Sequence, residues 1–282
     1  IFKKLPKISW KKKIISESKK YPYVLIDSYS IFGEKNRFEK FFLVGDNWTE
    51  NPQLPIAIVI GCNNWKFGFI SAYLKGYRVA FLGRKIIGFR AIKRILMLNN
   101  MPSNIFIWSY TEKTIFSIFI KLLKIFNCKI SRIEDGFIRS SELGASHSTP
   151  YSLVFDDKGL YFNSYKESNL EFLLNNYELD SSSSIIVKSN ELLELIVNQG
   201  LSKYNPPITP KLFKVKTKKI VAVLGQIDSD SSIKYGNPDN WDSDKLIYQA
   251  YIENPDAEII YRPHPEVYKK FQKSKFTLDL NK

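Results

Sequence analysis

The sequence predicts an α/β fold of two domains, and three observations support that prediction. Short apolar runs rich in β-branched residues alternate with helical runs between positions 55 and 134, as in a parallel sheet flanked by helices. The same strand–helix–strand pattern returns after a proline- and lysine-rich stretch at 206–218. Hydrophobic residues make up 44% of the chain and aromatic residues 15%, which is enough for a packed core. We therefore expect a first domain at 1–205, a linker at 206–218 and the beginning of a second domain at 219–282.

The strands and helices of the first domain are expected in regular order. Two short apolar runs, 23–27 and 41–46, come first, and "PIAIVIG" at 55–61 then reads as a strand buried on both faces. The runs after it are predicted alternately as helix and strand: 65–77, 78–83, 87–99, 104–110, 114–127 and 128–134. This order favours a mainly parallel sheet.

A different pattern follows position 150. "YSLVFDDKGLYFN" at 151–163 predicts a hairpin around "DDKG", and Ser168 is a suitable N-cap for the helical run that follows it. A polar turn then leads to a second helical run at 190–200. Beyond the linker we expect a strand at 219–225, a helix at 241–255 with Asp242 or Ser243 near its cap, and a strand entering a loop at 257–266.

Charge and cysteine content narrow the class of protein. The formal net charge is +14, which suggests an anionic partner such as a nucleic acid, an acidic or phosphorylated sugar, or an anionic membrane surface. Cys62 and Cys128 both fall in apolar strand-like segments, so we expect buried, unpaired thiols. No apolar run is long enough to cross a bilayer. The chain opens on Ile1, and we expect it to be part of something longer.

Three polar stretches follow predicted strands, at the edge where open α/β sheets bind ligands. The first holds Glu134 and Asp135, followed by Gly136 and Arg139. Two adjacent carboxylates can divide the work of general acid and base, and side-chain alternation along a strand directs only one of them into a cleft. The alternative is a turn held by an ion pair to Arg139, which the dipeptide alone favours.

The second stretch is "GQIDSDSSI" at 225–233. Asp228 and Asp230 are each placed to act as a nucleophile or base, and Ser231 and Ser232 could bind an anion or a hydroxyl group. The alternative is a helix cap or turn cluster, because Asp and Ser are ordinary turn residues.

The third stretch is "RPHPE" at 262–266, where two prolines stiffen the loop around His264. With Arg262 beside the imidazole, the loop suits an anionic phosphate, although a histidine satisfied by the backbone is a serious alternative. Zinc spacings, phosphate-binding glycine loops, a hydrolase nucleophile elbow and RNA-binding signatures are all absent from the sequence.

Taken together, these stretches resemble the bacterial β-Kdo transferases of capsule and lipopolysaccharide synthesis, which are retaining enzymes that use CMP-β-Kdo. The resemblance runs from about Arg132 to Val267 and is carried by "EDGFIRS", "PYSLVFDDKGLYFNSYKESNLEFLL", "LGQIDSDSSIKYG" and "IIYRPHPEV". A more distant similarity links the acid-pair and His-Pro motifs to bacterial sialyltransferases that use CMP-sialic acid. The resemblance implies a GT-B-like fold, with two Rossmann-like domains facing across a cleft. The first would bind the acceptor and the second the donor, and the second is expected to be incomplete in this chain.

The family's pattern also implies a role for each polar residue. Asp230 would be the nucleophile, with Asp228 as the alternative, and Glu134 or Asp135 would be the acid/base, with Glu134 preferred. Donor contacts would come from His264, Arg262, Gln226, Ser231 and Ser232, and the acceptor side would include Gly136 and Arg139. No metal or other cofactor is implied.

The expected partners are a CMP-activated sugar and an anionic bacterial glycan, either capsule or lipopolysaccharide O-antigen, and no nucleic acid is expected. The expected location is the cytoplasm, with peripheral attachment to the inner membrane. Two alternatives stay open: an inverting CMP-sialic-acid-type transferase, and a non-catalytic basic module that binds glycans or nucleic acid.

Overall fold

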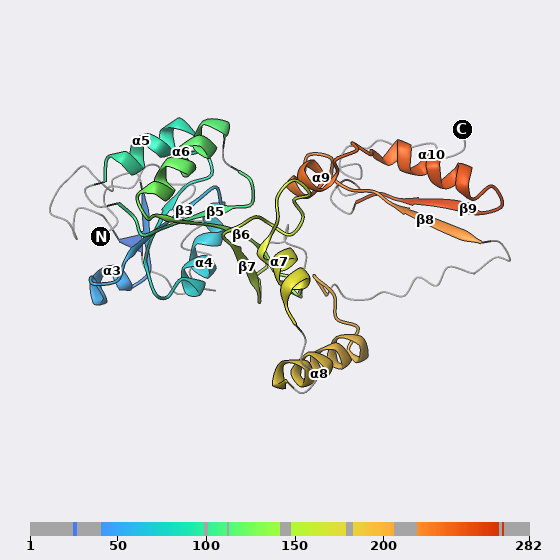
Figure 1. The fold of residues 1–282 in the computed structure, drawn as a ribbon, viewed down its shortest axis with the longest axis horizontal. Coiled ribbons are helices and arrows are strands. Elements are labelled where there is room, and N and C mark those ends of the chain that lie inside the picture. The colour runs from blue at the N-terminus through green and yellow to red at the C-terminus, as the bar shows by residue number, and fades with distance from the viewer. Residues whose placement is uncertain are drawn as a thin grey trace. The chain divides into compact units, whose positions relative to one another are not determined.

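The computed structural model describes residues 25–26, 41–98, 101–111, 113–141, 148–178, 183–205, 219–264 and 267. The predicted linker at 206–218 lies outside the described residues, as does most of the segment after His264. The chain divides into two compact units, one of residues 1–161 with 168–207 and one of residues 162–167 with 208–282 (Figure 1). The predicted facing of two domains across a cleft stays a prediction.

The first unit is built on a seven-stranded sheet with the order β1-β2-β4-β3-β5-β6-β7. The four central strands are parallel, as the alternation of strands and helices predicted: β3 (Ile56–Ile60), β4 (Arg78–Leu82), β5 (Asn104–Trp108) and β6 (Lys129–Asp135). Antiparallel strands extend the sheet on both sides: β1 (Leu25–Ile26), β2 (Phe42–Val44) and β7 (Leu153–Asp156).

Helices cover both faces of this sheet. On one face lie α5 (Phe89–Leu96) and α6 (Thr114–Ile125), and on the other lies α4 (Phe67–Tyr73), which follows the short 3-10 helix η1 (Asn64–Lys66) (Figure 1). The short α3 (Asn47–Glu50) follows β2 and buries Trp48, whose indole N–H donates to the carbonyl of Val79 at 3.0 Å.

The core explains why the strand at 56–60 is apolar throughout. Ile58 and Ile60 pack in the cluster beneath α5 and α6, whereas Ala57 and Val59 pack in the cluster beneath α4. Because successive side chains of a strand point to opposite faces, a strand covered on both sides has to be apolar at every position. Cys62 and Cys128 are buried and unpaired, which confirms the expectation for the thiols.

The predicted hairpin at 151–163 is wrong, because no second strand follows β7 within residues 157–163. The carboxylate of Asp156 instead accepts hydrogen bonds from the backbone N–H groups of Lys158, Gly159 and Asn169, each at 2.8–2.9 Å. Leu160 is fully buried, so the chain turns into the core of the unit and does not pair back along β7.

Two helices complete the first unit. Ser168 caps α7 (Asn169–Asn176), accepting from the N–H of Glu171 at 3.0 Å, and this confirms the predicted cap. Helix α8 (Ser184–Asn198) begins six residues earlier than the apolar run at 190–200 suggested, because Ser183 supplies a cap from within the serine tract.

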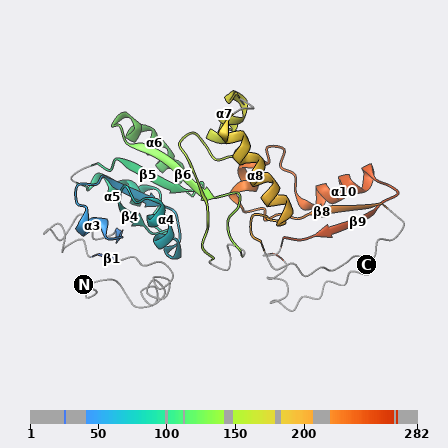
Figure 2. The same ribbon diagram turned by 90° about the horizontal axis from the view of Figure 1, so that it is seen from below.

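The second unit contains the predicted strand–helix–strand motif. Strands β8 (Ile220–Leu224) and β9 (Glu258–Arg262) pair in parallel, and α10 (Ser243–Glu253) packs against both (Figure 2). Asp242 is the N-cap of α10, as expected, and accepts from the N–H of Lys245 at 2.8 Å. A short helix that was not predicted, α9 (Ser231–Gly236), follows β8, and the carbonyl of Tyr235 accepts from the N–H of Ser164 at 2.9 Å.

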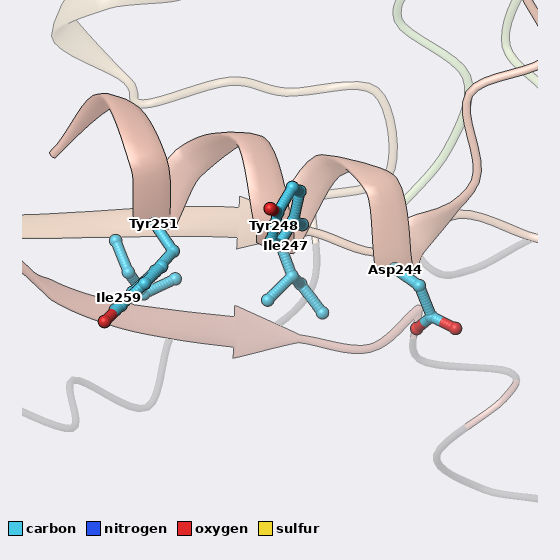
Figure 3. Close-up of a pocket in the computed structure, with 5 residues that line it drawn as sticks. All are labelled: Asp244, Ile247, Tyr248, Tyr251 and Ile259. Carbon is cyan, nitrogen blue, oxygen red and sulfur yellow. The ribbon is translucent and has the colours of Figure 1, made fainter. Parts of the chain in front are cut away.

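Two further features concern the surface. No helix within the described ranges is long and apolar enough to cross a membrane. In the second unit, α10 and β9 border an open apolar hollow that contains none of the predicted site residues (Figure 3). The side chains that line it are Asp244, Ile247, Tyr248, Tyr251 and Ile259.

Candidate functional site

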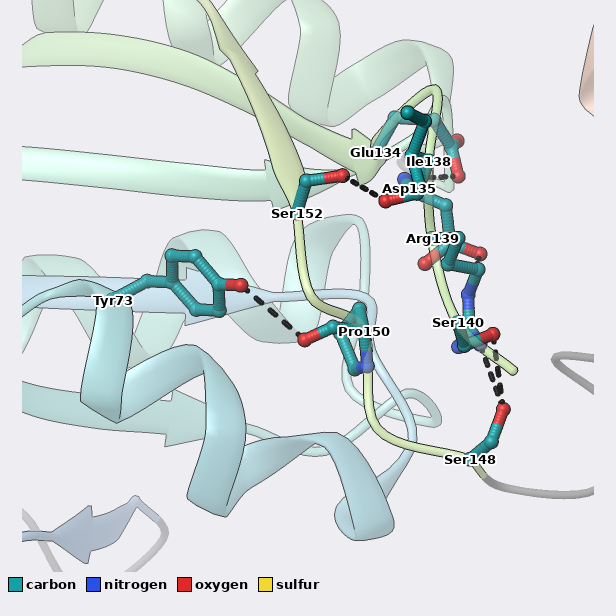
Figure 4. Close-up of polar contacts among 9 residues, drawn as sticks. All are labelled: Tyr73, Glu134, Asp135, Ile138, Arg139, Ser140, Ser148, Pro150 and Ser152. Atoms are coloured by element: carbon teal, nitrogen blue, oxygen red, sulfur yellow. Dashed lines mark hydrogen bonds and ion pairs between the residues drawn. The ribbon is translucent and has the colours of Figure 1, made fainter. Parts of the chain in front are cut away.

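Glu134 and Asp135 are the last two residues of β6, at the carboxyl edge of the parallel strands (Figure 4). Asp135 forms an ion pair with Arg139, with 2.8 Å between Oδ2 and Nε. The guanidinium is fully buried and the Asp135 side chain is 15% exposed, so water screens this pair weakly. The ion pair to Arg139, which the sequence suggested as the alternative to an acid/base role, is therefore present, and Asp135 is the carboxylate that forms it.

Arg139 ties the loop after β6 to its surroundings. Its Nη1 donates to the hydroxyls of Ser140 and Ser148, at 2.9 and 3.1 Å, and its backbone N–H donates to the carbonyl of Lys203 at 2.8 Å. The hydroxyl of Ser152 also donates to the carbonyl of Ile138 at 2.6 Å. Because the Arg139 side chain is fully buried, it can affect an acceptor only through the groups that it contacts, and its acceptor-side role stays a prediction.

Glu134 has a different environment from its neighbour. Burial raises the pKa of Glu134, and the charge of Asp135 raises it further. The Asp135 N–H, at 3.0 Å from Oε1, the Ser109 hydroxyl and the Lys66 ammonium act in the opposite direction. A carboxyl group with a raised pKa at the end of a strand is suited to exchange a proton with a substrate hydroxyl. The role of Glu134 as the acid/base stays a prediction.

Gly136 is a glycine for a packing reason. A Cβ at this position would overlap the Ser152 hydroxyl and approach the Ser152 carbonyl carbon at 2.8 Å. The Gly136 N–H donates to the carbonyl of Ser152 at 3.0 Å, so the backbones of the two segments approach closely. The acceptor-side role of Gly136 stays a prediction.

Sequence reasoning missed two basic residues beside the carboxylates. Lys66 is 8% exposed, and its Nζ lies 3.4 Å from the centroid of the Trp108 ring and 4.7 Å from that of Trp65. Burial lowers the pKa of Lys66 from 10.5 to about 8, against the opposing effect of Asp135 and Glu134. The signal was available: Lys66 follows the end of β3 between aromatic residues, on the same edge of the sheet as the acid pair.

The second is Lys203, on the segment that leaves α8. Burial by itself lowers the pKa of this ammonium, but the surrounding acidic and phenolic groups outweigh burial and raise it. Those groups are Tyr161, Tyr204, Asp135 and Glu134. The carboxylate pair therefore has basic side chains from several parts of the first unit around it.

Asp228 and Asp230 lie in the second unit, after β8. Asp230 is the N-cap of α9, where its Oδ1 accepts from the N–H of Ser232 at 3.1 Å, and both aspartates are exposed. Capping was the alternative explanation for this cluster, and the hydrogen bond also fixes the direction of the Asp230 carboxylate. Its role as nucleophile stays a prediction.

The ends of β8 and β9 bring the remaining predicted residues to one edge. Leu224 pairs with Arg262, and the Gly225 N–H donates to the Arg262 carbonyl at 2.8 Å. The loop that follows Gly225 and the loop with His264 therefore leave the same edge of the two-stranded sheet. Arg262 is exposed and His264 half-buried. The other predicted donor contacts, which all follow Gly225, are Gln226, Ser231 and Ser232.

The predicted site residues thus form two groups. Glu134, Asp135, Gly136 and Arg139 are together in the first unit. The aspartates, serines, Gln226, Arg262 and His264 belong to the second unit.

Comparisons with known proteins agree with the sequence motifs. The family model described as "Capsule polysaccharide biosynthesis protein" matches residues 124–205 and 208–280. The lipopolysaccharide-processing protein LpsZ of Rhizobium meliloti is 31% identical over 237 residues, covering 82% of this chain and 52% of LpsZ. The capsule polysaccharide modification protein LipA of Neisseria meningitidis serogroup A is 38% identical over 136 residues, 48% of this chain and 19% of LipA. The chain thus spans about half the length of the first relative and a fifth of the second.

Two solved structures from Thermosulfurimonas dismutans are similar in fold. The β-Kdo 2,7 transferase of KpsC matches with a TM-score of 0.52 and 27% identity, covering 75% of this chain and 61% of that one. The β-Kdo 2,4 transferase of KpsC matches with a TM-score of 0.60 and 23% identity, covering 80% and 66%. These likenesses confirm the α/β, GT-B-like fold class.

Proposed function

The chain belongs to the family of capsule polysaccharide biosynthesis proteins, and on this premise we propose that it is a glycosyltransferase that moves Kdo from CMP-β-Kdo to a bacterial surface glycan. The observation that carries the proposal is a half-buried carboxylate pair at the carboxyl end of β6, in a chain that shares its fold with the KpsC β-Kdo transferases. The LpsZ and LipA relatives, whose names refer to lipopolysaccharide and capsule, support the same class of acceptor.

The proposed reaction retains the anomeric configuration through two displacements. The Asp230 carboxylate attacks the anomeric carbon of Kdo, and CMP leaves with the electron pair of the broken bond. An acceptor hydroxyl then attacks the same carbon and releases Asp230, while Glu134 takes the proton of that hydroxyl. Each displacement inverts the carbon, so the product keeps the configuration of the donor.

The residues around β8 and β9 are proposed to hold the donor. His264 contacts the donor phosphate and Arg262 balances the charge of the departing CMP, with Gln226, Ser231 and Ser232 completing the donor contacts. The proposal includes no metal, because these side chains supply the stabilising charge. Asp228 is the alternative nucleophile, and Asp135 the alternative acid/base.

The nucleophile can be tested without disturbing the fold. Asp230→Asn keeps an N-cap side chain for α9 but removes the nucleophilic carboxylate, so it separates the two roles. We expect wild type to release CMP from CMP-β-Kdo with an acceptor glycan, and Asp230→Asn to lose at least about 100-fold in rate. Asp239→Asn, at another exposed acid of the same unit, is the control. A rate for Asp230→Asn equal to that of the control would show that the nucleophile is assigned wrongly.

Other outcomes identify the alternatives. An inverted linkage in the product would favour a transferase of the CMP-sialic-acid type, in which an acid of the Glu134 pair acts as base. A chain that releases no CMP but binds DNA tightly at moderate salt would favour a non-catalytic basic module, as its net charge of +14 would allow.

A further inference from the structure

Lys66 is a buried lysine, and lysine side chains are rarely buried. Of the basic side chains that the structure describes, only Lys66 and Arg139 are buried. The Lys66 ammonium lies over the faces of three aromatic rings, with Nζ at 3.4 Å from the centroid of Trp108, 4.7 Å from Trp65 and 5.8 Å from Phe69. Aromatic faces attract a cation, but they replace only part of the water that it loses.

The fold places this ammonium beside the carboxylate pair. Lys66 ends η1, which follows β3, and Trp108 is the last residue of β5. In the β5–β6 register Trp108 pairs with Ile133, the residue directly before Glu134. A cation held over the Trp108 ring is therefore next to the end of β6.

The charged groups near the end of β6 favour a cation at Lys66. Arg139 is committed to Asp135 through their ion pair. The carboxylates of Asp135 and Glu134 are the groups that most favour the protonated form of Lys66, and Lys66 in turn lowers the pKa of Glu134. Lys66 and Glu134 act on each other. The other titratable and charged groups that act on one or both of them are Cys62, Asp135, Arg139, Tyr161 and Lys203.

We propose that Lys66 is a positioning residue of the acid/base site: its buried ammonium, held by the Trp108 and Trp65 rings, favours the ionised form of Glu134 next to Asp135. The proposal rests on the proposed function for the statement that ionised Glu134 then takes the proton of the acceptor hydroxyl. Lys66 itself touches no substrate in this account. Its effect reaches the reaction only through the charge state of Glu134.

The electrostatic part is tested on the full chain without any substrate. The carboxyl ¹³C signal of Glu134, assigned with Glu134→Gln, is titrated in wild type, Lys66→Met and Lys66→Arg. Lys75→Met is the control, because Lys75 is exposed and lies beyond the opposite end of α4. We expect Lys66→Met to raise the pKa of Glu134 by about one pH unit, Lys66→Arg to restore it, and the control to leave it unchanged.

The same variants are then compared in CMP release with CMP-β-Kdo and an acceptor glycan. In Lys66→Met the acid limb of the kcat/KM profile moves upward by about the same amount, and the rate on that limb falls about tenfold. A Glu134 pKa that moves as expected supports the placement of the charge even if wild type releases no CMP, a result that counts against the proposed function alone. An unchanged Glu134 pKa in Lys66→Met, or an equal shift in Lys66→Met and Lys66→Arg, overturns the inference even if CMP release is fast.

Discussion

Replacing Lys66 with methionine is expected to stabilise the folded chain at neutral pH. The side chain is 8% exposed, and burial lowers the pKa of its ammonium from 10.5 to about 8, even with Asp135 and Glu134 nearby. Each pH unit between these values corresponds to about 1.4 kcal/mol, so holding the ammonium charged at pH 7 costs the folded state roughly 3 kcal/mol. Methionine fills a similar volume without a charge.

The stability difference between wild type and Lys66→Met is expected to depend on pH in a definite direction. Between about pH 8 and 10.5 the unfolded chain keeps the Lys66 proton that the folded chain has released, so wild-type stability gains from this group as pH rises. The advantage of Lys66→Met is therefore full below pH 8, falls by about 1.4 kcal/mol per pH unit above it, and vanishes near pH 10.5.

The measurement is urea unfolding of wild type and Lys66→Met between pH 6 and 10.5, with Lys75→Met as the control for loss of a surface charge. The difference between variants removes the contribution of the tyrosines and the other lysines, which titrate in both. A Lys66→Met variant that is less stable than wild type at pH 7, or a difference that does not change with pH, would refute the reasoning.

The remaining predictions concern the end of β6 with the loop that follows it, and the proposed chemistry. Asp135→Ala leaves the buried Arg139 guanidinium without its ion-pair partner and is expected to lower the free energy of unfolding in urea by about 3–5 kcal/mol. The double variant with Arg139→Met is expected to recover most of that loss, and additive losses would contradict a coupled pair. Gly136→Ala forces a Cβ against Ser152 and is expected to lower the free energy of unfolding by about 1–3 kcal/mol. Gly76→Ala, where a Cβ would meet no atom within 4 Å, is the control and is expected to change stability little. Equal effects of the two variants would argue against the close approach of Gly136 to Ser152. Treatment with EDTA is expected to leave CMP release unchanged, and a rate that falls with EDTA and returns with a divalent cation would contradict the metal-free proposal.

The sheet of the first unit could be predicted from the sequence because its central strands are buried on both faces. The run from Ile56 to Ile60 leaves no position for a polar side chain, so its burial is visible in the sequence itself. The ion pair of Asp135 with Arg139 could also be predicted, because the two residues are only four positions apart in the sequence. The family resemblance drawn from the polar stretches was confirmed by the match over residues 124–205 and 208–280.

The two main failures have different physical causes. The turn after β7 looked like a hairpin because "DDKG" is a turn signal, but a single carboxylate, that of Asp156, binds three backbone N–H groups and redirects the chain. The burial of Lys66 depends on Trp108, which comes from a strand more than forty residues further along the chain. In the first case, bonds from one carboxylate to nearby backbone decide the turn. In the second case, a contact between distant segments decides the burial.

The central claim is most directly tested by following the anomeric carbon. The full chain is incubated with CMP-β-Kdo and an acceptor glycan, and the configuration of the new linkage is determined by NMR. In parallel, Glu134→Gln with donor is examined by mass spectrometry of the peptide that contains Asp230. We predict a product with retained β configuration and a Kdo residue on the Asp230 peptide. An inverted product, or no CMP release from wild type with any acidic glycan acceptor, would contradict the account.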